Sequence, residues 1–441
     1  MTQTVRHDVL RRAREAGIRM IRFVFCDQSA VVRGTSTHVR LLEDRLQTGI
    51  TIPAAVANLS LLDLPAPTLE TAGELLLLPD PDSFVPLPYL PGVGSLIADL
   101  IALDGEPWPS CPRGFLRRML ARLEAKDLRV RSAFAGEFSL RREEGGTFQP
   151  LNDGPAYGTE GMNAAAPLID ALAGALEAQG IPVEHYHAGW GPGQHALSAR
   201  HAEGLRGADN QVILRETIRA MAAGKGIMAS FAPVPLAGQP RNSARIHLSL
   251  FSKDGRTAIF PDPRGAYGLS KAGRHWVAGV IAHLPAITAL TRASVNSYRQ
   301  TLPDNQPSWR SAVDGAAIRV AASPAHERTG AAYIELRSAD HTANPYLALG
   351  ALIAAGLDGI ARERDLGEPA STDLSEQGQL ESPPLPTSLL DALAALEADP
   401  ILGEAMGAPL LASFLAIKRL EATHFAAQDA EYEIRYHRDR F

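Results

Sequence analysis

The fold of this chain is decided by residues 343–360, which read ANPYLALGALIAAGLDGI. Asn344 is a typical helix N-cap residue, and Pro345 suits the first helical position because its missing N–H would have no helical partner there. The stretch therefore predicts a helix that begins at Pro345. Just before it, YIELR at residues 333–337 alternates polar and apolar side chains, as a strand does.

Three predicted strands carry polar residues on one face and apolar residues on the other, because successive side chains of a strand alternate. The polar faces hold Tyr333, Glu335 and Arg337 in YIELR, then Arg245, His247, Ser249 and Phe251 in RIHLSLF, and Ala133, Ala135, Glu137, Ser139 and Arg141 in SAFAGEFSLR. Three such faces predict a polar channel or an open-ended barrel. The alternative is a solvated sheet face that carries charges.

The rest of the chain predicts an α+β fold in two parts. Helices are expected at residues 8–16 and 115–128 and before Gly180, and strands at 20–27 and 181–187. A proline-rich stretch at 79–91 predicts an extended connection, with the domain boundary just after it. We therefore expect an N-terminal domain over residues 1–105 and a larger domain over 106–441. Residues 362–386 predict a surface loop.

Composition excludes several classes of protein. The 441 residues carry a formal net charge of -6 with both signs interspersed, which argues against a nucleic-acid partner. Only Cys26 and Cys111 are present, so a disulfide framework or a structural zinc site is not expected, and a reducing cytoplasm fits best. No apolar run reaches the length of a membrane span, so we expect no membrane partner.

Four sequence blocks resemble the glutamine synthetase family, in particular its γ-glutamyl-amine ligase branch. They are VEHYHAGWGPGQHAL at 183–197, FAPVP with RIHLSL between 231 and 250, VNSYRQTLP at 295–303, and YIELR with NPYLALGALIAAGLDGI between 333 and 360. The resemblance implies a small N-terminal β-grasp domain and a catalytic-type domain built as an open antiparallel half-barrel with helices. It also implies ATP with Mg²⁺ or Mn²⁺ as cofactors, since phosphoryl transfer develops negative charge that metal ions neutralise.

Most of the family's metal-ligand positions are substituted in this chain. By resemblance, Glu137 and Glu335 are the retained carboxylates, whereas Ala135, Gly189, Ala196 and Arg245 occupy ligand positions that have been lost. Mg²⁺ and Mn²⁺ prefer oxygen ligands, so four substitutions of six predict that a two-metal site is absent.

The positions that contact nucleotide and substrate in the family are retained only in part. The resemblance assigns His247 and Ser249 to the nucleotide side, and Arg319 and Arg337 remain as candidate catalytic arginines. Four single positions are substituted: Val234, Gln300, Gln306 and Asp314. The loop 239–243 also departs from the family, in which it is rich in Asn, Gly and Ser, and the segment 382–386 lacks the tyrosine that is adenylylated in some members.

Arg245 suggests a replacement for the missing ion. We hypothesise that its guanidinium takes the place of the second metal by pairing with Glu137 or Glu335, because facing carboxylates without a cation would destabilise each other. The rival interpretation is that Arg245 binds an anionic ligand.

Histidines near the GPGQ motif raise a further possibility. His185, His187 and His195 could form a new metal site, although three neighbouring histidines are more often hydrogen-bonded surface or core groups. Trp190, just before GPGQ, is expected to pack and to fill the space left by the ion.

Two functions follow from the resemblance. The first is a pseudoenzyme that has lost metal-dependent ATP:glutamate ligase chemistry and serves as a structural, regulatory or ligand-binding oligomer. The alternative is a divergent ATP-dependent carboxylate-amine ligase with altered substrate and metal sites. Family architecture implies self-association as a dodecamer or hexamer, with an active relative as a possible partner.

Overall fold

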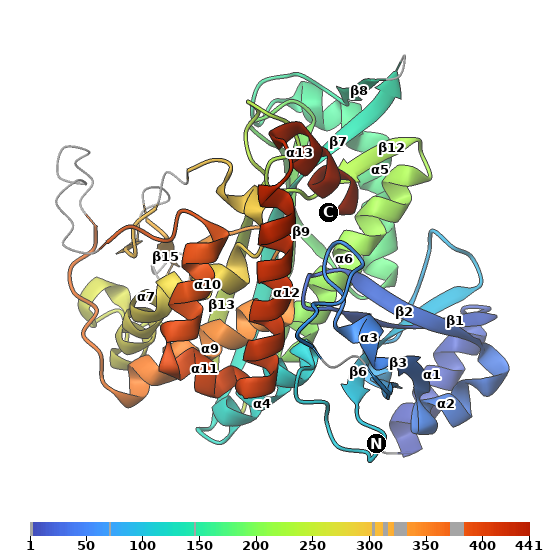
Figure 1. Ribbon diagram of the computed structural model, residues 1–441, viewed down its shortest axis with the longest axis horizontal. Helices are drawn as coiled ribbons and strands as arrows, with labels where there is room; N and C mark the ends of the chain where they lie inside the picture. The colour runs from blue at the N-terminus through green and yellow to red at the C-terminus, as the bar shows by residue number, and fades with distance from the viewer. Residues whose placement is uncertain are drawn as a thin grey trace.

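A small N-terminal domain packs against a larger helical and sheet domain in this computed structural model, which describes residues 3–69, 72–144, 147–301, 305–311, 316–321, 333–370 and 383–441. In Figure 1 the N-terminal domain is blue, and the C-terminal helices α10 to α12 cross the front of the larger domain in orange and red. The predictions that concern Asp314 and Ser382 fall outside the described residues.

The N-terminal domain contains a sheet of order β2-β1-β6-β4-β3, in which β1 and β6 are parallel and β5 pairs with β6. This arrangement agrees with the predicted β-grasp. Its elements are α1 (Gln3–Glu15), β1 (Met20–Cys26), β2 (Val32–His38), α2 (Leu42–Thr48), β3 (Ile50–Pro53), α3 (Ala54–Ala57), β4 (Glu74–Pro79), β5 (Val85–Pro86) and β6 (Val93–Ile101). Alternate residues of β1 point into the core, where Ile21, Phe23 and Phe25 are buried.

The proline-rich stretch is more than a connection, and this part of the prediction is wrong. Pro81–Ser83 forms a short 3-10 turn, and β5 and β6, which follow, are strands of the sheet. The prolines do keep the stretch out of α-helix. The chain leaves the sheet only after Ile101.

The larger domain is built on an open, curved sheet of order β14-β15-β16-β13-β7-β10-β9. The pairs along this order are antiparallel except β14 with β15. Its strands are β7 (Leu128–Glu144), β8 (Thr147–Pro150), β9 (Val183–Ala188), β10 (Gln194–Ala199), β11 (Ala202–Glu203), β12 (Ile227–Ser230), β13 (Ala244–Ser252), β14 (Trp309–Arg310), β15 (Ile318–Ala321) and β16 (Tyr333–Ala339). This sheet is the predicted half-barrel.

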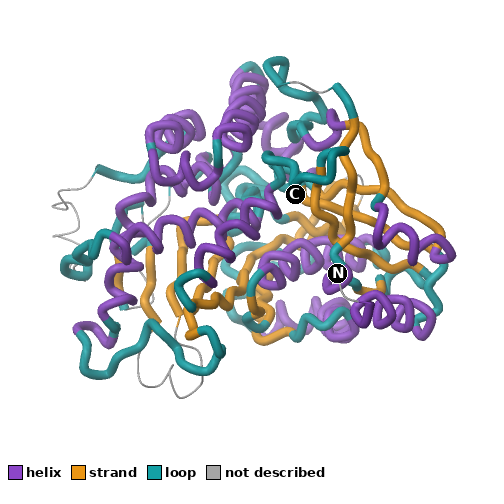
Figure 2. Tube along the Cα trace, turned by 90° about the horizontal axis from the view of Figure 1, so that it is seen from below, coloured by secondary structure: helices purple, strands orange, loops and turns teal. Residues whose placement is uncertain are grey.

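Helices lie on either side of the strands, as Figure 2 shows. They are α4 (Pro112–Glu124), α5 (Thr159–Ala178), α6 (Leu205–Ala223), α7 (Lys271–Thr291), α9 (Pro345–Ala361), α10 (Leu389–Ala398), α11 (Pro400–Met406), α12 (Ala408–Ala426) and α13 (Ala430–Arg440). The helix predicted to reach Leu128 ends at Glu124, because Asp127 adopts a φ of 56° and turns the chain into β7. Gly180, with a φ of 73°, follows α5 as predicted.

Helix α9 begins where the sequence predicted. The Oδ1 atom of Asn344 accepts hydrogen bonds from the backbone N–H groups of Tyr346 and Leu347, at 2.9 and 3.1 Å. Residues 345–359 are all buried, so α9 is a central core helix. The Nδ2 atom of Asn344 also donates to the carbonyl of Asp27 at 2.7 Å, which ties the N-terminal domain to the larger one.

A buried charge joins the two domains at a second place. Glu421 of α12 accepts hydrogen bonds from the Ser29 hydroxyl at 2.6 Å and from the Leu61 backbone N–H at 2.7 Å, and it pairs with Lys418 at 2.9 Å. Lys418 and Glu421 are 1% and 2% exposed, so this pair lies inside the protein. The interface between the domains is therefore part of one continuous packed structure.

No single helix among the described residues is both long and apolar enough to cross a membrane. Helices α11 and α12 meet that criterion only jointly, and they are bent by 105° where they meet.

Candidate functional site

A cavity of about 700 Å³ brings the predicted polar faces together. Strand β7 contributes Glu137, β13 contributes Arg245, His247 and Ser249, β15 contributes Arg319, and β16 contributes Tyr333 and Glu335. Their apolar neighbours Ile246, Leu248, Ile334 and Leu336 are buried on the opposite faces. The alternation read from the sequence therefore places these side chains correctly.

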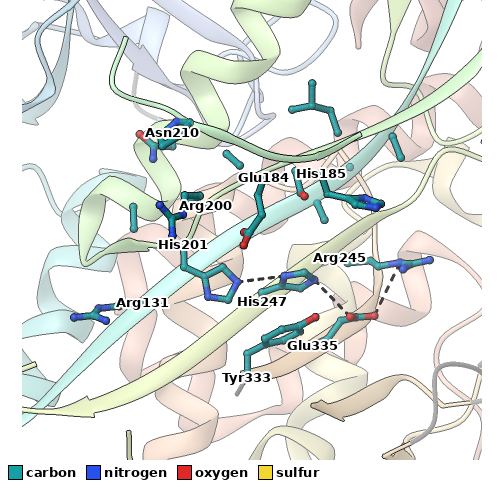
Figure 3. Close-up of a pocket in the computed structure, with 18 of the residues that line it drawn as sticks. Arg131, Glu184, His185, Arg200, His201, Asn210, Arg245, His247, Tyr333 and Glu335 are labelled. Atoms are coloured by element: carbon teal, nitrogen blue, oxygen red, sulfur yellow. Dashed lines mark hydrogen bonds and ion pairs between the residues drawn. The ribbon is translucent and has the colours of Figure 1, made fainter. Parts of the chain in front are cut away.

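Glu335 lies at the centre of a cluster of cations, part of which Figure 3 shows. Its Oε1 atom is 3.8 Å from Nε of Arg337 and 4.0 Å from Nε of Arg245. Its Oε2 atom is 3.3 Å from Nη1 of Arg319 and 3.5 Å from Nε2 of His247. Burial raises the pKa of Glu335, but His247, Arg245 and Arg319 outweigh burial and lower the pKa to about 2. The carboxylate is therefore ionised and already neutralised by the protein.

Glu137, the other carboxylate that the resemblance implies is retained, lies on β7 and is bound by Ser243 of the loop 239–243. Its Oε2 atom accepts hydrogen bonds from the hydroxyl and the backbone N–H of Ser243, at 2.6 and 2.8 Å. Among the described residues, Arg245 forms an ion pair with Glu335 and none with Glu137. The pairing hypothesis for Arg245 therefore has a geometric basis at Glu335, although 4.0 Å is the outer edge of ion-pair distance.

Three of the positions where the resemblance implies a lost metal ligand lie on β7 or on the strands that pair with it. Ala196 of β10 is opposite Glu137 of β7, and Arg245 of β13 is opposite Ala135 of β7. A Cβ atom at Gly189 would lie 2.7 Å from the side chain of Gln194, so this position is shaped for glycine.

The described residues do not fit the divalent ions that the family uses. They contain no group of three or more His, Cys, Asp or Glu side chains that could hold a metal ion. Mg²⁺ and Mn²⁺ need several oxygen ligands, whereas Glu335 faces cations and Glu137 is occupied by Ser243.

The three histidines near the GPGQ motif do not form a shared metal site within the described chain. The rings of His185 and His187 are 5.3 Å apart and both line the cavity. His195 is fully buried, its Nδ1 atom is 3.0 Å from the Tyr186 hydroxyl, and burial lowers its pKa to about 4. A hydrogen bond inside the protein thus accounts for the Nδ1 atom of His195.

Trp190 contradicts its prediction. The residue is 71% exposed and its ring meets that of Tyr157 edge-on, with centroids 6.4 Å apart, so it does not fill buried space beside the substituted positions. The preceding Gly189 and the turn held by Gln194 direct this residue outward, since the side-chain oxygen of Gln194 accepts the backbone N–H groups of Trp190 and Gly191. Tyr157 stacks on His187 instead, with ring centroids 4.1 Å apart.

His201 is a cavity residue that sequence reasoning missed. Its Nε2 atom is 3.3 Å from Nδ1 of His247, and its ring contacts Tyr333 edge-on (Figure 3). Burial lowers the pKa of His201 to about 4, with His247 adding to the effect. His201 follows β10 outside any alternating pattern, so the sequence offered no signal for it.

The cavity lies on an open half-barrel sheet, the architecture that the sequence resemblance implied, and comparison with known proteins assigns the chain to a family. Family models described as the glutamine synthetase N-terminal domain and the glutamine synthetase catalytic domain match residues 5–108 and 109–437. The chain belongs to the glutamine synthetase family. Family members use ATP and divalent metal ions and are typically oligomeric.

Individual relatives agree with this assignment. The chain is 35% identical over 362 residues to gamma-glutamylpolyamine synthetase GlnA3 of Streptomyces coelicolor, which covers 79% of this chain and 77% of the relative. It is 33% identical over 386 residues to a glutamine synthetase of Thermus thermophilus, and the match covers 82% of this chain and 84% of the relative. The crystal structure of a novel glutamine synthase homolog superposes with a TM-score of 0.86 at 31% identity, covering 96% of this chain and 99% of the other. The structure of GmaS without ligand also superposes with a TM-score of 0.86, at 29% identity, and the match covers 97% of this chain and 98% of GmaS.

Proposed function

We propose that this protein binds an anionic ligand in its central cavity without a metal pair, and that it has lost the metal-dependent ligase reaction of its family. It then serves as a ligand-binding, structural or regulatory member. In this role Arg245 is a fixed cation of the cavity wall, and Arg319, Arg337 and His247 hold Glu335 in its charged form.

The environment of Glu335 carries this proposal. Three guanidinium groups and one imidazole lie within 4.0 Å of its carboxylate oxygens. A divalent ion brought to this carboxylate would be repelled by the arginines, which cannot be deprotonated at ordinary pH. The same cations attract an anionic ligand.

The lost ligands also weaken phosphoryl transfer itself. Without carboxylates at Ala135, Gly189 and Ala196, the transition state loses charge stabilisation worth several kcal/mol, and each 1.4 kcal/mol is about a tenfold loss of rate. This loss of transition-state stabilisation favours ligand binding over turnover in the cavity.

The assembly and location are proposed on family grounds. We propose a dodecamer or hexamer in the cytoplasm, with an active glutamine synthetase relative as a possible partner. The domain boundary at 105 and 106 stays a prediction.

A second function has support from one relative. The chain shares 35% identity with gamma-glutamylpolyamine synthetase GlnA3 and keeps both Glu137 and Glu335 in an open cavity. A divergent carboxylate-amine ligase would use this cavity with an altered substrate and a rebuilt metal site.

Calorimetric titration with ATP, in the presence and absence of Mg²⁺ or Mn²⁺, separates the two functions. Phosphate release is then measured with glutamate and a panel of mono-, di- and polyamines. The proposal expects anion binding that does not depend on metal and that weakens in Arg245→Gln, together with no amine-stimulated phosphate release. The exposed Arg256 provides the matched control Arg256→Gln. Metal-dependent ATP binding with amine-stimulated phosphate release would refute the proposal and establish the ligase.

A further inference from the structure

A second group of cations lies in and around the loop 239–243, beside the wall of the cavity that Glu137 and Ser243 form. The Nη2 atom of Arg241 donates to Oδ2 of Asp340 at 3.3 Å, and the Arg241 side chain is 12% exposed. The guanidinium of Arg292 lies 4.4 Å from the centre of the Tyr298 ring, and Arg292 is 2% exposed. The backbone N–H of Asp340 donates to the carbonyl of Thr291, so the two sides of the cluster are joined.

Several buried donors in this cluster have no hydrogen-bond partner within the described chain. They are Nε and Nη1 of Arg241, Nε of Arg292 and the hydroxyl of Tyr298. Buried polar groups are nearly always paired, and leaving one unpaired destabilises the folded state. So many unpaired donors in one place indicate that something outside the chain accepts from them.

The charges of the cluster are also unbalanced. Among the described residues Arg241 pairs with one carboxylate, Asp340, whose Oδ1 atom is already engaged by the hydroxyl and N–H of Thr342, and Arg292 donates to the carbonyl of Ser297. Burial lowers the pKa of Arg241 to about 10; Asp340 opposes this change, whereas Arg292 adds to it. Glu137 opposes it more weakly, and Ser243 holds that carboxylate. The local field is therefore positive.

The loop itself is fixed in place around Arg241. The Gln300 side chain donates to the carbonyl of Gln239 at 2.7 Å, and the Gln194 side chain donates to the carbonyl of Arg241 at 2.7 Å. The resemblance implies a loop rich in Asn, Gly and Ser at this place, where this chain has Arg241. A rigid loop that carries a partly unpaired arginine is a pre-organised binding element.

We propose that Arg241, Arg292 and Tyr298 form a binding site for a small monovalent anion, either a carboxylate or a halide. Water could accept from the free donors, but it would leave the positive charge without compensation. An anion satisfies the donors and the charge together. This site does not depend on how the central cavity is used.

Bromide tests the site directly, because it scatters anomalously and is a small monovalent anion. Crystals of the full chain are soaked in sodium bromide, alone and with sodium formate. Thermal unfolding is followed as sodium bromide or formate replaces sodium gluconate at constant ionic strength. Three variants are compared with wild type: Arg241→Gln, Tyr298→Phe, and the exposed control Arg256→Gln.

We expect an anomalous peak within hydrogen-bond distance of Arg241, and a saturable rise in melting temperature with bromide or formate. The apparent affinity should fall about tenfold or more in Arg241→Gln and less in Tyr298→Phe, and Arg256→Gln should match wild type. Displacement of bromide by formate would identify a carboxylate site, and retention would identify a halide site. Absence of the peak, or equal titrations for wild type and both cluster variants, would overturn the proposal. Tyr298→Phe removes one hydroxyl only, so it keeps the test decisive if Arg241→Gln fails to fold.

Discussion

Replacing Glu335 with Gln tests the electrostatic centre of the cavity. The substitution keeps the size and shape of the side chain but removes its charge. Arg245, Arg319 and Arg337 would then lose the carboxylate they share, all within 4.0 Å of it. Breaking a buried charge cluster by removing one sign is strongly destabilising, because the remaining charges are uncompensated.

The magnitude follows from the pKa of Glu335. The folded protein lowers this pKa from 4.5 to about 2, which at 1.36 kcal/mol per pKa unit corresponds to about 3 kcal/mol of stability. Because the folded pKa is the lower one, this contribution is fully present above pH 4.5 and is lost as the pH falls through about 2. We therefore expect Glu335→Gln to lower the free energy of unfolding by about 3 kcal/mol at neutral pH.

Denaturant unfolding of wild type and Glu335→Gln over a series of pH values measures this effect. The difference between the two proteins should be constant above pH 4.5 and should shrink toward acid. The exposed Glu404 provides the control Glu404→Gln, which should match wild type throughout. A neutral-pH difference below about 0.5 kcal/mol, or a difference that grows toward acid, would refute the reasoning.

Three further predictions concern the scaffold. Asn344→Ala removes the N-cap of α9, and we expect urea denaturation to show a free energy of unfolding lower by about 1–2 kcal/mol. An unchanged free energy of unfolding would mean that the cap is unimportant. Gly136→Ala would place a Cβ atom 2.2 Å from the ring of His341, so we expect a clear drop in melting temperature; an unchanged value would show that His341 moves freely. Asp399 and Asp358 outweigh burial and raise the pKa of His283, so the contribution of this histidine to stability is complete below pH 6.5 and is lost as the pH rises through the folded pKa. We therefore expect His283→Gln to lower the melting temperature less at alkaline pH than at acid pH. A larger decrease at alkaline pH would contradict this reasoning.

Much of the scaffold could be predicted because its signals are local. The cap at Asn344 and the alternation around Glu335 depend only on neighbouring residues, and both appear in the structure as expected. The cavity could also be predicted in outline, since the alternation decides which face of β13 carries Arg245 and His247.

The parts that could not be predicted depend on contacts between distant segments. The bond from Ser243 to Glu137 joins a loop to β7, and the approach of His201 to His247 joins the segment after β10 to β13, which does not pair with β10. The exposed position of Trp190 depends on a turn that Gln194 holds. None of these contacts leaves a periodic trace in the sequence.

The buried pair of Lys418 and Glu421 has a consequence for how the protein unfolds. Glu421 binds Ser29 and Leu61 of the N-terminal domain while its partner belongs to the same C-terminal helix. Separating the domains would remove the Ser29 and Leu61 donors and leave this carboxylate in an apolar surface. The boundary between the domains is therefore not a place where the polypeptide can be cut into two autonomous pieces, and heat should melt both domains in a single calorimetric transition.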